Sequence, residues 1–479
     1  MSEPTIEAEP RQCWIAGAGE RGERSLTVRH PFDDTDVADV TVPDDEQIER
    51  AVAAAAEIAD QFRRTPAGQR KWALAHIADL LVRRGEEIAE TITAESGKPW
   101  RWAEAEVAQA VQVFHAAAAI AAEFTGELGA TSTPRSASAA AASRFAADGP
   151  IRLAVARRRA RGPVLAIGSS TFPLAGVARQ VAPALAVGAP VISKPASLTP
   201  LSALLLGEIM AEADLPSGAF SVLPLRGKHL ADLVQDPRLP VISVTGARAT
   251  GAAVRTAAPG KHFVTELGGT TTAIVCPDLA GDLDLTGVAE QIALAANARA
   301  GQDRLAVRHV LVHQDIAEAF QAALLGAVRA LVTGSPHDPE VTVGPLVSEE
   351  SAILATQWID EAVAAGATLL TGGVRDRASL TPTVLAVPPE FATEELLAPV
   401  ILLSTVDNTR SAFAATNGRD SDLPVGVLTH DVRTALLAAD ELDADVVVGA
   451  LPSETAAADD LADIVAAYTR PQRVVLGGE

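Results

Sequence analysis

Apolar residues between positions 44 and 81 recur at intervals of three and four, which places them on one face of a helix. They are Ile48, Ala51, Ala55, Ile58, Phe62, Trp72, Leu74, Ile77, Leu80 and Leu81. A turn at Ser96-Gly97-Lys98-Pro99 precedes a further stretch that predicts a helix from Trp102 to Thr125. We therefore expect the first third of the chain to be helical.

The pattern changes at Pro163, where short apolar runs begin to alternate with helical segments. Strands are predicted at 164–167, 191–193, 220–223 and 241–244, and helices at 174–187 and 200–213. Strands that alternate with helices form a parallel sheet, because each helix carries the chain back to the same edge.

A second block of the same kind begins near Phe263. Its predicted strands lie at 273–275, 310–312, 368–370 and 400–404, and its helices at 316–331 and 348–365. The fold class is therefore α/β with two doubly wound domains. Their bounds are 1–130 with 151–262 for the first, and 263–448 for the second.

Two segments stand apart from these domains, at 131–160 and 451–479. The first is a loop rich in Ser, Ala and Thr that leads to a predicted strand at 151–159. The second is polar and ends in a predicted strand at 473–476. A strand at the end of a chain exposes backbone N–H and C=O groups, which favours pairing with a neighbouring sheet.

Composition limits the environment and the partners. With 479 residues and 48 % hydrophobic content the chain can bury a large core, and its net charge of -22 disfavours nucleic acid and anionic membranes. The acidic N-terminus lacks the features of a signal peptide, and the alanine runs near 116–122 and 139–142 are too short and interrupted to cross a bilayer. We expect a cytoplasmic protein with no nucleic-acid or membrane partner.

Nine short segments, in order along the chain, resemble landmarks of the aldehyde dehydrogenase superfamily. They lie at 95–99, 194–200, 215–218, 245–246, 266–269, 343–346, 366–373, 381–385 and 394–399. The resemblance extends from about residue 27 to residue 476. It implies a Rossmann-like cofactor domain, a catalytic-type domain and a small β-element through which relatives form oligomers.

The resemblance also implies a site for NAD or NADP. Lys194 matches the lysine that holds the adenosine ribose, and Glu395 matches the glutamate that holds the nicotinamide ribose. Gly246 and Gly251 keep the glycine spacing at the helix start that faces the pyrophosphate, where N–H groups favour an anion. The serine expected between them is Ala247.

Two aromatic side chains of the family's cofactor site are replaced as well, by Ser170 and Leu397. Leu397 stands where an aromatic covers the nicotinamide. Because a hydroxyl and two aromatic faces are missing, we expect nucleotide binding to be weak or absent.

The family's reaction centre is changed more deeply. Gly301-Gln302-Asp303-Arg304 resembles the motif Gly-Gln-x-Cys, but a guanidinium cannot attack a carbonyl as a thiolate does. Glu266 matches the general base of that family. Thr171, before Phe172-Pro173, occupies the place of the asparagine that stabilises the oxyanion.

Arg304 admits two interpretations. It can pair with Glu266 across the space that forms the catalytic tunnel in the family and so fill the cavity. Alternatively, it can anchor an anionic ligand with help from Arg299 and Arg308.

Other chemistry-bearing residues have simpler explanations. Cys276 is expected to be a buried filler rather than a displaced nucleophile. His309 and His313 share one face of a strand, but no cysteine or carboxylate accompanies them, so we predict no metal site. The hydroxyls of 169–171 are expected to cap the following helix.

Three functions remain open on this basis. The first is a non-catalytic or regulatory subunit, a pseudoenzyme of the family that still binds a nucleotide. The second is an enzyme of another kind, with Glu266 as acid or base and Arg304 and Arg299 gripping an anionic substrate. The third is an active NAD(P)-dependent dehydrogenase. In each case we expect a homodimer or a higher oligomer, which can include an active relative.

Overall fold

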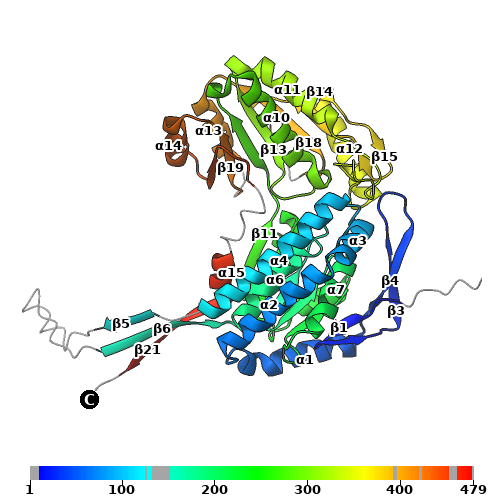
Figure 1. The fold of residues 1–479 in the computed structure, drawn as a ribbon, viewed down its shortest axis with the longest axis vertical. Helices are drawn as coiled ribbons and strands as arrows, with labels where there is room; N and C mark the ends of the chain where they lie inside the picture. The colour runs from blue at the N-terminus through cyan, green and yellow to red at the C-terminus, as the bar shows by residue number, and fades with distance from the viewer. Residues whose placement is uncertain are drawn as a thin grey trace, which may run out of the picture.

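The protein consists of two α/β lobes and a projecting β-arm (Figure 1). The computed structural model describes residues 10–123, 127–131, 152–391, 396–419, 423–452 and 461–476.

A seven-stranded sheet organises the first lobe, in the order β11-β10-β7-β8-β9-β1-β2. These strands are β11 (His262–Leu267), β10 (Val241–Gly246), β7 (Val164–Ile167), β8 (Val191–Lys194), β9 (Phe220–Val222), β1 (Cys13–Ile15) and β2 (Ala18–Glu20). The five strands from β11 to β9 are parallel, and β1 and β2 add an antiparallel edge. Every residue of β7 is buried, as an apolar run covered by helices on both faces requires.

Helices surround this sheet. They are α1 (Asp45–Phe62), α2 (Ala67–Arg83), α3 (Gly85–Ser96), α4 (Trp100–Glu123), α6 (Ala175–Ala186), α7 (Leu201–Ala211), α8 (Lys228–Gln235) and α9 (Arg248–Ala257). By length and composition α4 could cross a membrane, but it packs against α2 and α6 and contributes Val113 and Phe114 to the core. It has the character of a core helix.

The second lobe contains another seven-stranded sheet, in the order β14-β17-β18-β13-β12-β19-β20. Its strands are β14 (Thr368–Thr371), β17 (Thr383–Ala386), β18 (Val400–Val406), β13 (Val307–His313), β12 (Thr271–Val275), β19 (Val425–Leu428) and β20 (Val446–Val448). Its helices are α10 (Asp282–Asn297), α11 (Ala317–Ala330), α12 (Glu349–Ala364), α13 (Thr409–Asn417) and α14 (Val432–Glu441). The predicted fold class, two doubly wound domains, is confirmed.

The arm is a three-stranded antiparallel sheet in the order β21-β6-β5, and it extends away from the first lobe (Figure 1). Its strands are β5 (Glu127–Thr131), β6 (Arg152–Ala160) and β21 (Thr469–Leu476). The C-terminal strand therefore pairs with β6 of its own chain, along one edge. The predicted loop at 131–147 lies outside the described residues from position 132 onward.

Three details of the predicted organisation are wrong. The N-terminal region is not purely helical, because β1, β2 and the hairpin of β3 (Arg24–Arg29) with β4 (Asp36–Val42) precede α1. The domain boundary at residue 263 is too early, because β11 pairs with β10 in the first sheet. The tail contains a helix, α15 (Leu461–Tyr468), which packs on α6 and α4.

Candidate functional site

A cavity of about 490 Å³ lies at the carboxyl ends of the first sheet's parallel strands. β8 contributes Lys194 to its lining, β10 contributes Gly246 and β11 contributes Glu266. The loop before β13 adds Arg304, and the turn before α6 adds Thr171. Open α/β sheets bind ligands at this edge. The structure thus brings together five of the seven predicted site residues.

The strand order gives the cavity two ends. Lys194 ends β8 and Glu266 lies on β11, with β7 and β10 between them. At the usual spacing between strands, the two positions are about 14 Å apart along the sheet edge. We call the part from Lys194 to the start of α9 the lysine end. The part around Glu266, Arg179 and Arg304 is the glutamate end.

The lysine end suits an anion. Ala247 is the N-cap of α9 and makes no side-chain cap hydrogen bond, so the N–H groups of the first turn stand beside the cavity. At Gly246, with φ of 153°, a Cβ would meet no atom within 4 Å. Burial, and then the charge of Arg226, lower the pKa of Lys194.

Gly251 has a different role from the predicted one. It lies one turn into α9, where a Cβ would approach a methyl group of Leu267 to 2.6 Å. Its missing side chain therefore permits close packing of α9 on β11. It is not among the described residues that line the cavity.

Two arginines converge on one oxygen at the glutamate end. Arg179 of α6 donates to Oε1 of Glu266 from Nε at 3.1 Å and from Nη2 at 2.5 Å. Nη2 of Arg304 lies 3.9 Å from the same oxygen, which confirms the predicted proximity. The prediction that Arg304 fills the cavity is wrong, because its side chain lines the cavity and keeps 21 % of its exposure.

These contacts hold Glu266 ionised. Burial raises its pKa, but the charges of Arg179 and then Arg304, with hydrogen bonds from Arg179 and Thr245, outweigh that effect. The net pKa lies below the ordinary value for a glutamate. A general base works best with a pKa near the operating pH, so Glu266 is poorly placed for that role.

The hydroxyl of Thr171 is engaged within the protein. It donates to the backbone carbonyl of Gln302 at 2.9 Å. A hydroxyl has one hydrogen to donate, so this bond competes with any contact to an oxyanion. The structure thus places Thr171 at the cavity but directs its donor toward the second lobe.

A buried ion pair fixes the turn that carries Thr171. Lys98 pairs with Glu106 and donates from Nζ to the backbone carbonyl of Thr171 at 2.7 Å. Glu106 in turn accepts from the backbone N–H groups of Leu174 and Ala175 at 2.9 and 3.0 Å. The start of α6 is therefore capped by a glutamate of α4, and the predicted capping by the hydroxyls of 169–171 is wrong.

The loop before Arg304 has an unusual main chain. Arg299, Ala300 and Gly301 are all left-handed, with φ of 56°, 52° and 62°. A Cβ at Gly301 would lie 2.2 Å from the backbone oxygen of Ala398, so only glycine fits there. Two consecutive non-glycine residues in this conformation store strain that the surroundings must offset.

Arg308 holds this loop through hydrogen bonds to backbone carbonyls and does not form an anion site with Arg304. Its guanidinium donates to the backbone carbonyls of Leu396 at 2.7 Å, of Val400 at 3.4 Å and of Gly301. The interpretation of Arg308 as part of an anion clamp is therefore wrong.

Arg299 does not join Arg304 either. It pairs with Asp303 at 2.8 Å and lies over the rings of Phe172 and Trp102. It is not among the described residues that line the cavity, so its predicted part in an anion clamp is also wrong.

Glu395 lies outside the described residues, so its predicted contact with the nicotinamide ribose stays a prediction. Cys276 is buried, as expected of a filler, and burial raises its pKa to about 12. Burial, followed by the charges of Arg419 and Arg308, lowers the pKa of His309 to about 3. In the described part of the chain, no cluster of three or more His, Cys, Asp or Glu side chains could hold a metal.

Arg179 is the site residue that the sequence analysis missed. All twelve residues of α6 are buried, and the side chain of Arg179 is only 4 % exposed. Arg179 is the only charged residue of this helix, and a buried charge requires a partner of opposite charge. The position of Arg179 in this helix indicated a buried ion pair, but its partner on β11 could not be predicted from the sequence.

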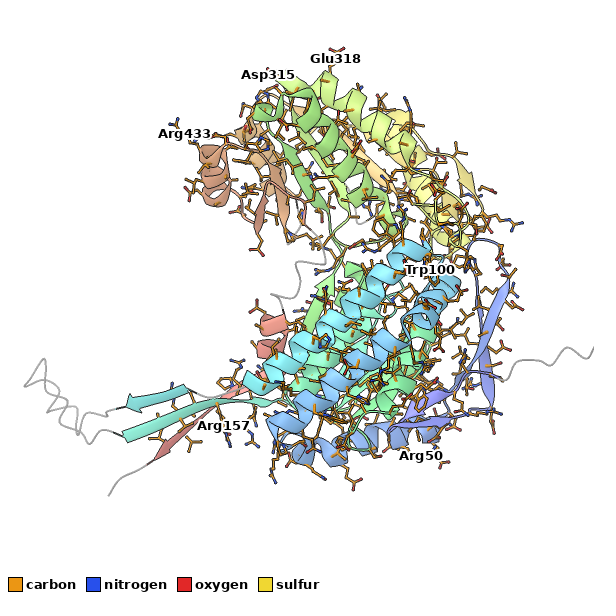
Figure 2. The ribbon with its side chains drawn as sticks, viewed as in Figure 1. Arg50, Trp100, Arg157, Asp315, Glu318 and Arg433 are labelled. Atoms are coloured by element: carbon orange, nitrogen blue, oxygen red, sulfur yellow. The ribbon has the colours of Figure 1, made fainter. Side chains whose placement is uncertain are left out.

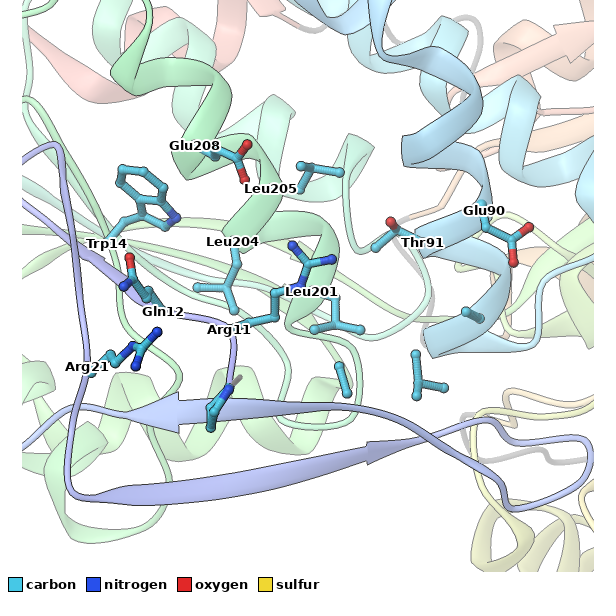
Figure 3. Close-up of a pocket in the computed structure, with 14 residues that line it drawn as sticks. Arg11, Gln12, Trp14, Arg21, Glu90, Thr91, Leu201, Leu204, Leu205 and Glu208 are labelled. Carbon is cyan, nitrogen blue, oxygen red and sulfur yellow. The ribbon is translucent and has the colours of Figure 1, made fainter. Parts of the chain in front are cut away.

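A second cavity, of about 480 Å³, lies between the N-terminal strands, α3 and α7 (Figure 3). Its apolar floor is made of Leu201, Leu204 and Leu205, and Arg11 and Arg21 extend over it from the N-terminal segment. None of the six predicted site residues that the structure describes lines it. The cavity at the sheet edge is therefore the candidate site.

Comparison with known proteins agrees with this architecture. A model described as "Aldehyde dehydrogenase family" matches residues 14–455. A 3-sulfolactaldehyde dehydrogenase from Priestia aryabhattai is 30% identical over 431 residues, covering 89% of this chain and 86% of that protein.

Solved structures give the same result. Aldehyde dehydrogenase 21 from Physcomitrella patens, in complex with the reaction product succinate, has a TM-score of 0.89 at 30% identity, covering 98% of this chain and 99% of that one. An NADP-dependent glyceraldehyde-3-phosphate dehydrogenase from Bacillus halodurans, complexed with NADP, has a TM-score of 0.88 at 27% identity, with coverage of 98% and 99%.

Proposed function

The chain belongs to the aldehyde dehydrogenase family, and we propose that it does not perform cysteine-dependent aldehyde oxidation. It acts instead as a cytoplasmic, non-catalytic or regulatory subunit that binds a nicotinamide nucleotide weakly. This pseudoenzyme role differs from that of the relatives named above, which carry dehydrogenase names.

The cluster of Arg304, Arg179 and Glu266 is the observation that carries the proposal. A guanidinium occupies the place of the thiol, so no thiohemiacetal can form at position 304. Glu266, which the resemblance assigns to base catalysis, is held ionised by two arginines. Thr171 directs its hydrogen to Gln302. Nucleophile, base and oxyanion donor are thus all compromised in one place.

A nicotinamide dinucleotide fits the lysine end. Lys194 offers a donor to its adenosine ribose, as the resemblance implies, the uncapped start of α9 offers backbone N–H groups to its phosphates, and the space beside Gly246 leaves room for them. When bound, this cofactor supplies hydride chemistry to the family's enzymes. Because Ala247 and Leu397 lack the hydroxyl and the aromatic face of the family pattern, we expect a dissociation constant in the high micromolar range or weaker. Calorimetry that gives low micromolar binding would overturn this expectation.

An enzyme of another kind remains the second candidate. Arg179 and Arg304 line the same cavity and could hold an anionic substrate next to Glu266. In this candidate function Arg179, rather than the predicted Arg299, binds the anionic substrate together with Arg304. The lowered pKa makes Glu266 a weak base, which argues against proton transfer, so this candidate comes second to the non-catalytic role.

A turnover assay separates these candidates from an active dehydrogenase. A panel of short, aromatic and acidic aldehydes with NAD or NADP is expected to give no reduced nicotinamide above the blank. Turnover by the unaltered protein contradicts the proposal. The variants Cys276→Ala and Cys13→Ala would then show whether either thiol of the chain is responsible.

We also propose that the protein forms a homodimer or a higher oligomer, with an active relative as a further partner. The arm carries exposed Val474 and Val475 and an arginine cluster that includes Arg157 at its base (Figure 2). Neighbouring arginines, chiefly Arg63, lower the pKa of Arg159. A cationic arm on a chain with a net charge of -22 is complementary to the surface of another copy.

Light scattering at micromolar concentration tests this assembly. A mass of about twice 49.4 kDa or more is expected, and deletion of 470–479 should reduce it. A mass of one chain that the deletion does not change contradicts the assembly.

A further inference from the structure

Two cationic residues lie close together beside the lysine end of the cavity. Lys194 ends β8, and Arg226 follows β9, which is the next strand of the sheet. The two strands run parallel, and the backbone N–H of Leu223 donates to the carbonyl of Ser193 at 2.8 Å, so both chains leave the sheet at the same edge. The charge of Arg226 is close enough to lower the pKa of Lys194. Leu230 of α8, four residues after Arg226, lines the cavity itself.

The described residues provide no carboxylate that balances these two cations. Glu266 is the only carboxylate among the described residues that line the cavity, and it lies at the glutamate end. Within the described part of the chain, neither Lys194 nor Arg226 has a side-chain hydrogen bond or ion pair. No carboxylate opposes the fall in the pKa of Lys194. The lysine end therefore has an excess of positive charge that a bound anion can neutralise.

Two further carboxylates, those of Glu394 and Glu395, lie outside the described residues. The next residue, Leu396, accepts a hydrogen bond at 2.7 Å from Arg308, which also holds Gly301 in the loop of the glutamate end. Two residues of extended chain span about 7 Å. Both carboxylates are thus tethered to the glutamate end, where the resemblance expects Glu395 to contact the nicotinamide ribose.

NAD and NADP differ in one group, the phosphate on the 2′-oxygen of the adenosine ribose. This is the ribose that the resemblance assigns to Lys194. In doubly wound sheets a carboxylate commonly binds the free 2′-hydroxyl of NAD, whereas an arginine accommodates the 2′-phosphate of NADP. A phosphate monoester is close to a dianion at neutral pH and accepts charge-assisted hydrogen bonds. Two neighbouring cations without a described carboxylate suit the phosphate better than the hydroxyl.

We propose that this chain binds NADP(H) in preference to NAD(H), and that Arg226 determines the preference by contacting the 2′-phosphate. The inference rests on the proposed function, because it requires the cavity to accept a nicotinamide nucleotide. It assigns a role to an arginine that is exposed and lies beside the described lining of the cavity. Lys194 acts on both nucleotides, since both contain the adenosine ribose.

Calorimetry on the full-length protein with NADP⁺ and NAD⁺ tests the preference. NADP⁺ is expected to bind about tenfold more tightly, the effect of one charge-assisted hydrogen bond at a partly screened site. Adenosine 2′,5′-bisphosphate and adenosine 5′-monophosphate repeat the comparison without the nicotinamide half, and a similar ratio is expected. A preference that only the dinucleotides show would arise away from the 2′-phosphate contact and would overturn the role of Arg226.

Arg226→Gln is expected to lower the ratio toward one, mainly because NADP⁺ binds more weakly, whereas Arg226→Lys should retain part of the preference. Arg83→Gln is the matched control, because it removes the same charge from an exposed position on α2 and should leave the ratio unchanged. Thermal unfolding checks that each variant is folded.

The outcomes separate this inference from the proposed function. Equal affinity for NADP⁺ and NAD⁺, or a ratio that Arg226→Gln does not alter, overturns the preference while nucleotide binding stands. No binding of either dinucleotide at millimolar concentration overturns both the preference and the nucleotide-binding part of the proposed function.

Discussion

The lysine end and the glutamate end of the cavity are built from different kinds of interaction. The lysine end uses main-chain groups, namely the start of α9 and the space beside Gly246, together with one long side chain, Lys194. The glutamate end depends on the identity of three side chains, Glu266, Arg179 and Arg304. An end made of backbone tolerates substitution, whereas an end made of side chains changes its chemistry with a single replacement.

The largest expected effect is a gain of aldehyde oxidation through substitutions at the glutamate end. Arg304→Cys restores a thiol, but Thr171 still directs its hydroxyl to the carbonyl of Gln302. The double variant Arg304→Cys/Thr171→Asn is therefore expected to oxidise aldehydes about 100-fold faster than Arg304→Cys alone. Formation of reduced nicotinamide measures both rates, and Thr171→Asn alone should stay at the blank. Equal rates for the single and double variants would show that Thr171 does not limit the site.

Loss of the carboxylate at the same end should destabilise the fold. Glu266→Ala leaves Arg179 buried with its ion pair to Glu266 removed, which is expected to lower the free energy of unfolding by about 3 kcal/mol. Urea denaturation measures it, and Glu57→Ala, on the exposed face of α1, is the control with an expected change below about 0.5 kcal/mol. A loss as small as that of the control would mean that the cluster adds nothing to stability.

The same carboxylate predicts a pH dependence. The pKa of Glu266 is lower in the folded protein than in the unfolded chain, so its stabilising effect is present at neutral pH and is lost as the pH falls through the folded value. The difference in unfolding free energy between the wild type and Glu266→Gln should therefore shrink below about pH 4. Urea denaturation at pH 7, 5 and 3.5 measures it. A difference that grows on acidification would indicate a raised pKa instead.

The smallest expected effect lies at the lysine end. Ala247→Ser supplies the missing N-cap hydroxyl of α9 and should stabilise the fold by about 1 kcal/mol. Ala253→Ser, at an exposed position inside the same helix, should instead cost up to about 0.5 kcal/mol. Thermal unfolding of the two variants compares them. If Ala247→Ser and Ala253→Ser change the stability equally, the N–H groups at the start of α9 already have other hydrogen-bond partners.

The features that could be predicted from the sequence are those that depend on the order of strands and helices along the chain. Alternation of strands and helices gave both sheets, and the motif positions of Lys194, Gly246 and Glu266 placed them at one edge. Contacts between distant segments were not predictable in the same way. The pairing of Arg179 with Glu266 joins residues 87 positions apart, and the cap that Glu106 provides for α6 joins residues 68 positions apart.

Short strands were also missed, for a physical reason. β1 and β2 have three residues each, too few for a period of two to stand out from chance. β1 pairs with β9 and β2 pairs with β1, so both are formed by contact with a neighbouring strand rather than by their own pattern. The helix α15 was missed because its eight residues follow a polar stretch, although Leu461, Ile464, Val465 and Tyr468 recur at the intervals of three and four that indicate a helix.

The guanidinium of Arg308, which holds the carbonyl oxygen of Gly301, also bears on how this protein arose. Because the loop is shaped from behind, its path does not depend on the side chain at position 304. Codons for cysteine and arginine can differ by a single base, so an ancestor could have exchanged catalysis for a cation in one mutational step, with the scaffold intact. The reverse step restores only the thiol, because Thr171 would still direct its hydroxyl to the carbonyl of Gln302, so the return to catalysis takes more substitutions than its loss.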